Sequence, residues 1–311
     1  ALEFNSQSEA TIPEPQIYNC LVNRNYNEAI TYSFIDAAYA QQFVDTINTA
    51  LCLTNPISAE MGFMRPSLIP GLIKTVQYNQ NRQQERIRLF EVGVRFIENA
   101  DGLQQIKTIA GVCYGYAAPE CWTNPKRLVD FYDIKADVEA LFALGHNSKH
   151  LSFVAANDIA MHPGKCAQIV LDGIVVGKIG ALHPELQQTL GLPNPLYMFE
   201  IDYTAVASAN VASFNVFSKY PAVRRDIALL VAKNISAAKL QQAIQQVAGD
   251  LLTDLVIFDV YQGKGIPEDQ KSMALGLTLQ RTDRTLTDLE VNDLFTSVLN
   301  MLQREFNATL R

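Results

Sequence analysis

Leu255-Val-Ile-Phe-Asp-Val-Tyr261 and Ser272-Met-Ala-Leu-Gly-Leu-Thr-Leu-Gln280 are two strongly apolar runs, separated by the Gly- and Pro-containing segment Gln262–Gln270. Each run has the length, the composition and the alternation of a strand, and a short Gly-containing segment between such runs is typical of a hairpin loop. The sequence therefore predicts a β-hairpin over residues 255–280. The elements on either side of this hairpin decide which sheet it joins.

The flanking segments complete a βαββαβ order. Arg225–Val231 is predicted as a strand, and Ser236–Val247 as a helix whose N-terminus Ser236 caps. Beyond the hairpin, Thr287–Phe306 is predicted as a long helix and Asn307–Leu310 as a short edge strand. This order is that of the ferredoxin-like, RRM-like fold, in which both helices cover one face of four antiparallel strands. The helix positions predicted to face the sheet, or to lie near that side, are Leu240, Ile244, Val247, Leu289, Leu294, Val298, Leu302 and Phe306.

Alternation along the hairpin predicts which side chains face the helices and which face away from them. Successive side chains of a strand point to opposite faces of the sheet. The set predicted to face the helices is Phe258, Val260, Met273, Leu275, Leu277 and Leu279. The set predicted to face away is Asp259, Tyr261, Ser272, Ala274, Gly276 and Thr278.

Three residues of the outward set carry chemistry suited to a nucleobase. An exposed Tyr261 is a stacking platform, and such stacking contributes about 1–3 kcal/mol per base. A carboxylate such as Asp259 accepts hydrogen bonds from two parallel N–H donors, which guanine presents on its Watson–Crick edge. Ser272, predicted to lie across the ladder from Tyr261, supplies a hydroxyl contact. The residues predict a face that reads a single-stranded RNA loop.

Basic residues near this face are candidates for phosphate contacts. Arg224 shares the outward parity, Lys219 and Arg225 lie near the entrance of its strand, and Lys264 lies in the hairpin loop. From parity alone, a solvated sheet face that carries an ordinary Tyr and Asp stays an equal alternative.

The upstream part of the chain has the pattern of an α+β domain built on an antiparallel sheet. Helical spacing of Leu68, Ile69, Leu72, Ile73 and Val76 predicts an amphipathic helix that is buried within the domain or partly against a partner helix. The other predicted helices cover residues 16–24 and 130–144, and the predicted strands cover residues 28–34, 87–96, 106–115, 168–171, 173–181 and 196–203.

The domain organisation predicted from these segments has four parts. Residues 1–15, a polar stretch with Pro13 and Pro15, are expected to be an inter-domain linker, which suggests a fragment of a longer protein. Residues 16–205 form the first domain, residues 206–213 a join, and residues 214–311 the βαββαβ domain.

Composition and charge exclude several classes of protein. The chain has 311 residues and a net charge of −7, and its last part is neutral, with 11 Lys and Arg against 11 Asp and Glu in residues 214–311. A duplex-binding DNA protein would carry a strong basic excess. No apolar run is long enough to span a membrane, and no signal peptide is visible. Five cysteines without a C-x-x-C pair favour a reducing, cytoplasmic location without disulfides or a zinc site.

Several motifs together resemble the bacterial phenylalanyl-tRNA synthetase β chain. In the last domain the resemblance lies in Phe217–Ile227, Phe258–Pro267, Lys271-Ser272 and Arg281–Leu286. Upstream it lies in Glu28–Phe34, Asn55-Pro56, Met64–Leu72, Asn79–Arg82, Leu89–Gly93, His162–Gly164 and Gly180–Glu185.

The resemblance implies roles for these parts. In that family the β chain pairs with a catalytic α chain in an α2β2 assembly, and the C-terminal domain binds the anticodon of the phenylalanine tRNA. The family packs the first anticodon base, a guanine, onto a Tyr with an Asp and a Ser as hydrogen-bond partners. By motif these roles fall on Tyr261, Asp259 and Ser272. The family's N-terminal tRNA-binding, editing and helical modules, and the metal site associated with them, have no counterpart in these residues.

The resemblance also makes residues 16–205 similar to a class II synthetase catalytic domain. Working class II enzymes hold ATP with an Arg-x-Glu strand motif and a late Gly-rich motif that ends in Arg. Here the comparable strand is Phe90-Glu-Val-Gly-Val-Arg95, which contains no Arg-x-Glu. The late strand Met198–Tyr203 has no Arg. A phosphate without its cationic clamp is poorly stabilised. We therefore expect no catalytic residues, cofactor or metal in this chain, with ATP and Mg²⁺ of the whole phenylalanine–tRNA ligase bound elsewhere.

Two other functions remain compatible with the residues. One is an amino-acid-sensing regulatory module, because the βαββαβ order also serves small-ligand domains. The other is a self-sufficient ligase, which would show ATP–pyrophosphate exchange without a partner chain.

Overall fold

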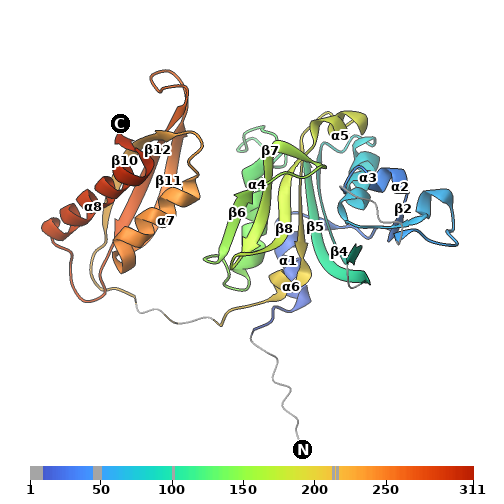
Figure 1. The fold of residues 1–311 in the computed structure, drawn as a ribbon, viewed down its shortest axis with the longest axis horizontal. Helices are drawn as coiled ribbons and strands as arrows, with labels where there is room; N and C mark the ends of the chain where they lie inside the picture. Colours follow the sequence, from blue (N-terminus) through green and yellow to red (C-terminus); the bar gives the residue numbers. More distant parts are fainter. Residues whose placement is uncertain (1–9, 45–50, 100–101, 212–213, 215–216) are drawn as a thin grey trace, which may run out of the picture. The chain divides into compact units, whose positions relative to one another are not determined.

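The computed structural model describes residues 10–44, 51–99, 102–211, 214 and 217–311, and the chain divides into two compact units, Ala1–Ala212 and Ser213–Arg311 (Figure 1). Residues 1–9 of the predicted linker and residues 212–213 of the predicted join lie outside the described residues. All five cysteines are free. In the described part of the chain, no helix is both long and apolar enough to cross a membrane.

The first unit is built on a seven-stranded sheet with the order β1-β4-β5-β9-β8-β7-β6. Neighbouring strands run antiparallel, except that β1 pairs with β4 in parallel. The strands are β1 (Asn27–Glu28), β4 (Arg86–Asn99), β5 (Gly102–Gly115), β6 (Leu151–Ala155), β7 (Met161–Leu171), β8 (Ile174–Leu182) and β9 (Leu196–Asp202).

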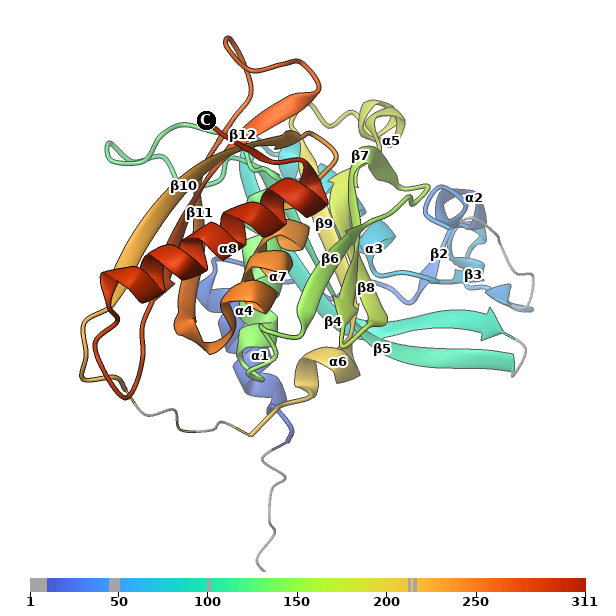
Figure 2. The same ribbon diagram turned by 60° about the vertical axis from the view of Figure 1, so that its left-hand side comes forward.

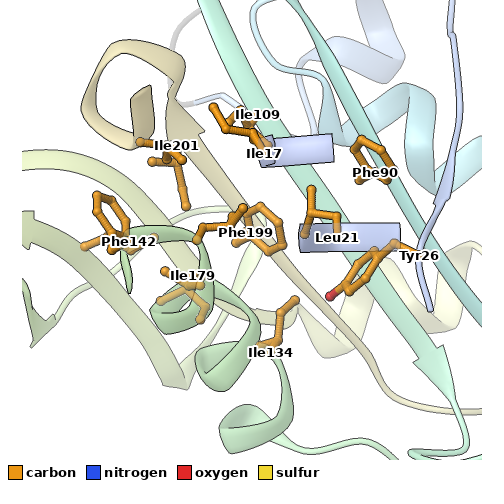
Figure 3. Close-up of a cluster of buried hydrophobic side chains, with 14 of the residues drawn as sticks. Ile17, Leu21, Tyr26, Phe90, Ile109, Ile134, Phe142, Ile179, Phe199 and Ile201 are labelled. Carbon is orange, nitrogen blue, oxygen red and sulfur yellow. The ribbon is translucent and has the colours of Figure 1, made fainter. Parts of the chain in front are cut away.

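Helices cover both faces of this sheet. On one face, α1 (Glu14–Asn23) and α4 (Phe131–Ala143) bury Leu21 and Ile134 in a cluster that also holds Phe90 and Phe199 (Figure 3). On the other face, α3 (Ile69–Gln80) packs its apolar stripe against the alternate residues of the same strands. This division follows from strand alternation, because neighbouring positions of β9 enter different clusters. The predicted stripe Leu68, Ile69, Leu72, Ile73 and Val76 is buried inside the unit.

The structure corrects several predictions for the first unit. The predicted strand 28–34 is wrong, because only its ends pair, in β1 and in β2 (Phe34–Ile35), which joins β3 (Phe63–Met64) in a separate two-stranded sheet. The helix α6 (Tyr203–Ala207) buries Val206 and Ala207, so these residues belong to the core and not to the predicted join. Not predicted were β6, α2 (Ala37–Ala40) and α5 (Pro184–Thr189), which are short and have weak periodicity.

The second unit is a four-stranded antiparallel sheet with two helices on one face, as predicted (Figures 1 and 2). Its strand order is β11-β12-β10-β13. The elements are β10 (Val223–Ala232), α7 (Ala237–Ala248), β11 (Leu252–Tyr261), β12 (Gln270–Leu279), α8 (Asp288–Phe306) and β13 (Thr309–Leu310).

Caps set the helix ends of this unit. Ser236 caps α7 by accepting a hydrogen bond from the Lys239 N–H, and Thr287 and Glu290 form a capping box on α8. The predicted inward positions Val247 and Leu289 are exposed. Each lies beside the buried stripe of its helix. In α7 the buried stripe includes Ala243 and Ala248 and not Val247, and in α8 the buried residues begin at Val291.

Candidate functional site

The face of the second-unit sheet that points away from α7 and α8, here called the outer face, carries the predicted site. Met273, Leu275 and Leu277 of β12 are buried in the core with the helices, so the alternate β12 positions lie on the outer face. Tyr261 pairs across the ladder with Ser272, and Asp259 pairs with Ala274. The register therefore places Asp259, Tyr261 and Ser272 on the same face.

A β-bulge in β11 changes the alternation upstream of Asp259. The register shifts between Ile257 and Asp259, which leaves Phe258 as the extra residue. Phe258 is 51% exposed, and the Arg224 guanidinium lies 5.7 Å from its ring centroid. The prediction that Phe258 faces the helices is therefore wrong. Val260 pairs with the buried Met273 as expected, yet it is 53% exposed.

The Tyr261 ring is accessible and its hydroxyl is anchored. The side chain is 38% exposed, and the hydroxyl donates a hydrogen bond to the Lys264 carbonyl oxygen at 3.3 Å. A Cβ added at Gly263 would lie 2.9 Å from the Tyr261 hydroxyl oxygen, so the loop passes close to the phenol. The hairpin loop thus holds the edge of the ring in place while part of the ring stays open to solvent.

Ser272 is covered, contrary to the prediction of an accessible hydroxyl. It is only 4% exposed, and its Oγ lies 3.4 Å from the Arg311 Nη1, which donates to it. The Arg311 guanidinium also lies 5.4 Å from the Tyr261 ring centroid. Sequence reasoning missed Arg311, because a single Arg beside a two-residue strand carries no pattern of its own.

Most of the predicted basic residues lie away from Tyr261. Arg224 pairs across the ladder with Thr278, about 20 Å along β12 from Ser272 at the usual rise per residue. Arg224 forms an ion pair with Asp226 at 2.8 Å and lies above Gly276, where an added Cβ would be 2.6 Å from Nη2. Its neighbour Arg225 pairs with the buried Leu277, so Arg225 belongs to the face of the sheet that the helices cover.

Two other predicted basic residues lie in loops. Lys219 is exposed in the segment before β10, and Lys264 is exposed in the hairpin loop whose carbonyl oxygen holds Tyr261. The structure thus brings together Tyr261, Ser272, Lys264 and Arg311 at the hairpin end of the sheet. Lys219, Arg224 and Arg225 lie at or before the start of β10.

The first unit has a cavity of about 430 Å³ on the α3 side of its sheet, and several of the charged residues that line it have partners within the unit. Lys178 pairs with Asp158 at 2.7 Å, and Arg95 pairs with Asp202 at 2.9 Å. Glu200 accepts from the Ser67 hydroxyl and the Leu68 N–H, both at 2.8 Å. Burial acts to lower the pKa of Lys178, but the Glu200 and Asp158 carboxylates outweigh it and raise that pKa. The two carboxylates therefore stabilise the charged form of Lys178.

Comparisons with known proteins match both units. Residues 3–203 match the family described as "Phenylalanyl tRNA synthetase beta chain CLM domain", and residues 218–311 match "Ferredoxin-fold anticodon binding domain". The chain is 45% identical over 311 residues to the phenylalanine–tRNA ligase beta subunit of Pseudomonas syringae pv. tomato. It is 46% identical over 306 residues to that of Pseudomonas fluorescens, and 45% identical over 313 residues to that of Pseudoalteromonas translucida.

These alignments cover nearly all of this chain and a smaller share of the relatives. The match to the Pseudomonas syringae protein covers 100% of this chain and 39% of the relative, and the match to the Pseudomonas fluorescens protein covers 98% and 38%. Among solved structures, a pyrrolysyl-tRNA synthetase from Desulfitobacterium hafniense aligns with a TM-score of 0.47 and 11% identity, over 62% of this chain and 64% of that one.

Proposed function

Because the chain belongs to the phenylalanyl-tRNA synthetase β chain family, we propose that its second unit binds the anticodon loop of the phenylalanine tRNA. The first unit is the scaffold on which the catalytic α chain of the α2β2 ligase assembles. In this proposal the chain serves ATP-dependent phenylalanylation in the cytoplasm as one part of a larger enzyme.

The observation that carries the RNA-binding proposal is the shared outer face of Tyr261 and Asp259, two residues apart on β11. A partly open phenol ring offers a base a flat surface for stacking. A carboxylate on the same face accepts from the N1–H and the 2-amino group of guanine, which are parallel donors. Adenine presents an acceptor at N1, and two acceptors facing each other repel. The pair therefore favours guanine over adenine as the stacked base.

The basic residues contribute a weaker, sequence-independent attraction. Lys264 is exposed in the loop next to Tyr261, whereas Lys219, Arg224 and Arg225 lie at the other end of β10. Because the second unit has no net charge, it attracts RNA phosphates only locally. We therefore expect modest affinity from this chain without the rest of the assembly.

The scaffold role is supported by the use of charged groups in the first unit. Arg95, Lys178 and Glu200 bind internal partners in the cavity on the α3 side. Charges committed to such pairs stabilise the fold and are not held ready for a transferring phosphate. ATP and Mg²⁺ are accordingly assigned to the α chain. In the described residues, no group of three His, Cys, Asp or Glu side chains is placed to hold a metal ion.

A binding experiment tests the anticodon proposal. The 311-residue chain is titrated into anticodon stem-loops of the phenylalanine tRNA that carry either guanine or adenine at the first anticodon position, and fluorescence anisotropy gives Kd. We expect tighter binding of guanine. Tyr261→Ala should weaken binding by about 5- to 150-fold, which corresponds to the loss of one stacked base.

The matched control is Tyr132→Ala, which removes an exposed Tyr from α4 of the other unit. It should leave Kd unchanged. Equal affinity of the unmutated chain for both stem-loops contradicts the guanine assignment. Absence of any binding contradicts the anticodon proposal for this chain, and ATP–pyrophosphate exchange by the chain alone contradicts the scaffold proposal.

A further inference from the structure

The Arg311 side chain reaches across the outer face from the edge of the sheet. Its backbone is held in place, because the Arg311 N–H donates to the Ala228 carbonyl oxygen at 3.0 Å next to the β13–β10 pairing. Thr309 pairs with Leu230, Leu230 with Ser272, and Ser272 with Tyr261, so one row of residues crosses all four strands. The Arg311 guanidinium lies over this row, 3.4 Å from Ser272 Oγ and 5.4 Å from the Tyr261 ring centroid.

The charge of Arg311 is available to a ligand. Among the ion pairs of the described residues, none joins the Arg311 guanidinium to an Asp or Glu side chain. Arg224, the other arginine on this face, is already paired with Asp226 at 2.8 Å. A guanidinium has five N–H donors, and one contact to a serine hydroxyl leaves most of them unused.

We propose that Arg311 is a further specificity-determining residue, which donates hydrogen bonds to the acceptor edge of the guanine stacked on Tyr261. This inference rests on the proposed function of the outer face. Guanine presents O6 and N7 as adjacent acceptors, and a guanidinium matches both at once. Adenine presents N7 beside a 6-amino donor, so a donor would face a donor.

Arg311 and Asp259 then discriminate by complementary chemistry. Asp259 accepts from the donor side of guanine, and Arg311 donates to its acceptor side. Each contact fails with adenine for its own reason. The buried Ser272 hydroxyl accepts a hydrogen bond from Arg311, and this contact helps to hold the guanidinium close to the Tyr261 ring.

The test removes one acceptor atom from the base and one donor group from the protein. Stem-loops carrying guanine, 7-deazaguanine or inosine at the first anticodon position are titrated with the 311-residue chain and with Arg311→Gln. In 7-deazaguanine a C–H replaces N7, and inosine lacks the 2-amino group that Asp259 accepts from. The unmutated chain should bind 7-deazaguanine about 10- to 150-fold more weakly than guanine, as expected for one lost hydrogen bond to a charged group.

Arg311→Gln should abolish the difference between guanine and 7-deazaguanine and keep the penalty for inosine. Arg311→Lys keeps the charge but lacks the planar fork that contacts O6 and N7 at once. It should therefore lose the difference in Kd between guanine and 7-deazaguanine and keep the salt dependence of binding. The charge-matched control is Arg304→Gln, on an exposed Arg of α8 that pairs with Glu305. It should leave every ratio unchanged.

Two outcomes overturn the inference while the proposed function stands. One is an undiminished 7-deazaguanine penalty in Arg311→Gln. The other is an equal weakening of all three stem-loops, which assigns Arg311 to a phosphate. If the unmutated chain fails to distinguish guanine from adenine, the guanine assignment on which this inference rests fails, and if it binds no stem-loop, the proposed function itself fails. Thermal unfolding of each variant separates loss of contact from loss of fold.

Discussion

Arg88 and Asp137 form an ion pair inside the first unit, with Nη1 and Oδ2 2.9 Å apart and the two side chains only 8% and 3% exposed. The pair joins β4 to α4. Asp137 also accepts from the Tyr26 hydroxyl at 2.7 Å and from Arg24 Nε at 2.6 Å. Burial, together with Cys113 and Asp137, raises the pKa of the Tyr26 hydroxyl well above its usual value, so it stays a donor.

Asp137→Asn should therefore destabilise the first unit strongly. The variant leaves the buried Arg88 charge without its counter-charge, and breaking a buried pair in this way typically costs about 3–5 kcal/mol. Urea unfolding followed by circular dichroism measures the change. Glu139→Gln, which breaks an exposed pair with Lys135 on the same helix, serves as the control and should cost less than about 0.5 kcal/mol. Equal midpoints for both variants would contradict this assignment.

Gly111→Ala should destabilise the core of the same unit. Gly111 pairs with Phe199 across β5 and β9, and an added Cβ would lie 2.4 Å from the Phe199 Cε1. Because the Phe199 ring is fully buried, it has little room to move, and such overpacking costs about 1–3 kcal/mol. Gly164→Ala is the control, since its Cβ would meet only His162 atoms at 3.5 Å or more. Thermal unfolding measures the Tm of both variants. Gly111→Ala should lower it and Gly164→Ala should not, and equal Tm values would contradict the tight packing of Gly111 against Phe199.

The capping box of α8 should make part of the stability pH-dependent. Hydrogen bonds from the Thr287 backbone, Arg284 and the Thr287 side chain lower the pKa of Glu290 to about 2, from an ordinary 4.5. Because the folded-state pKa is the lower one, the carboxylate stabilises the fold above pH 4.5, and this contribution is lost as the pH falls towards 2.

The measurement is the Tm of the unmutated chain and of Glu290→Gln at several pH values. The unmutated chain should melt at the higher temperature at pH 7, and the difference should shrink steadily between pH 5 and pH 2. A difference that does not change with pH would show that the Glu290 charge has no role in the cap.

Asp259→Asn should reduce the discrimination between guanine and adenine more than it weakens the binding of the stem-loop. An amide presents a donor as well as an acceptor, so it tolerates the N1 acceptor of adenine, while stacking on Tyr261 is preserved. The ratio of Kd for adenine and guanine stem-loops should fall by about 5- to 150-fold, the value of one good bidentate contact. Asp254→Asn, an exposed position earlier on β11, is the control and should keep the ratio. A ratio in Asp259→Asn equal to that of the unmutated chain would contradict the role of Asp259 in guanine recognition.

The element order of the second unit could be predicted because its determinants are local. Alternation marked β11 and β12, while Ser236 and Thr287 marked the starts of α7 and α8. Alternation predicted correctly that Asp259 and Tyr261 share the outer face, because both lie downstream of the bulge in β11. At Phe258 the same counting failed, because a one-residue insertion in the ladder leaves no mark in the apolar pattern.

The sequence by itself thus determined the two sheet-based units, the buried stripe of α3 and the candidate pair Tyr261 and Asp259. These features depend on residues a few positions apart, whose preferences add along one helix or strand. Only the tertiary structure decided that Phe258 turns outward, that Ser272 is covered and that Arg311 lies beside Tyr261. Arg311 and Ser272 are 39 positions apart, and contacts of that kind form only when the packed sheet brings its strands together.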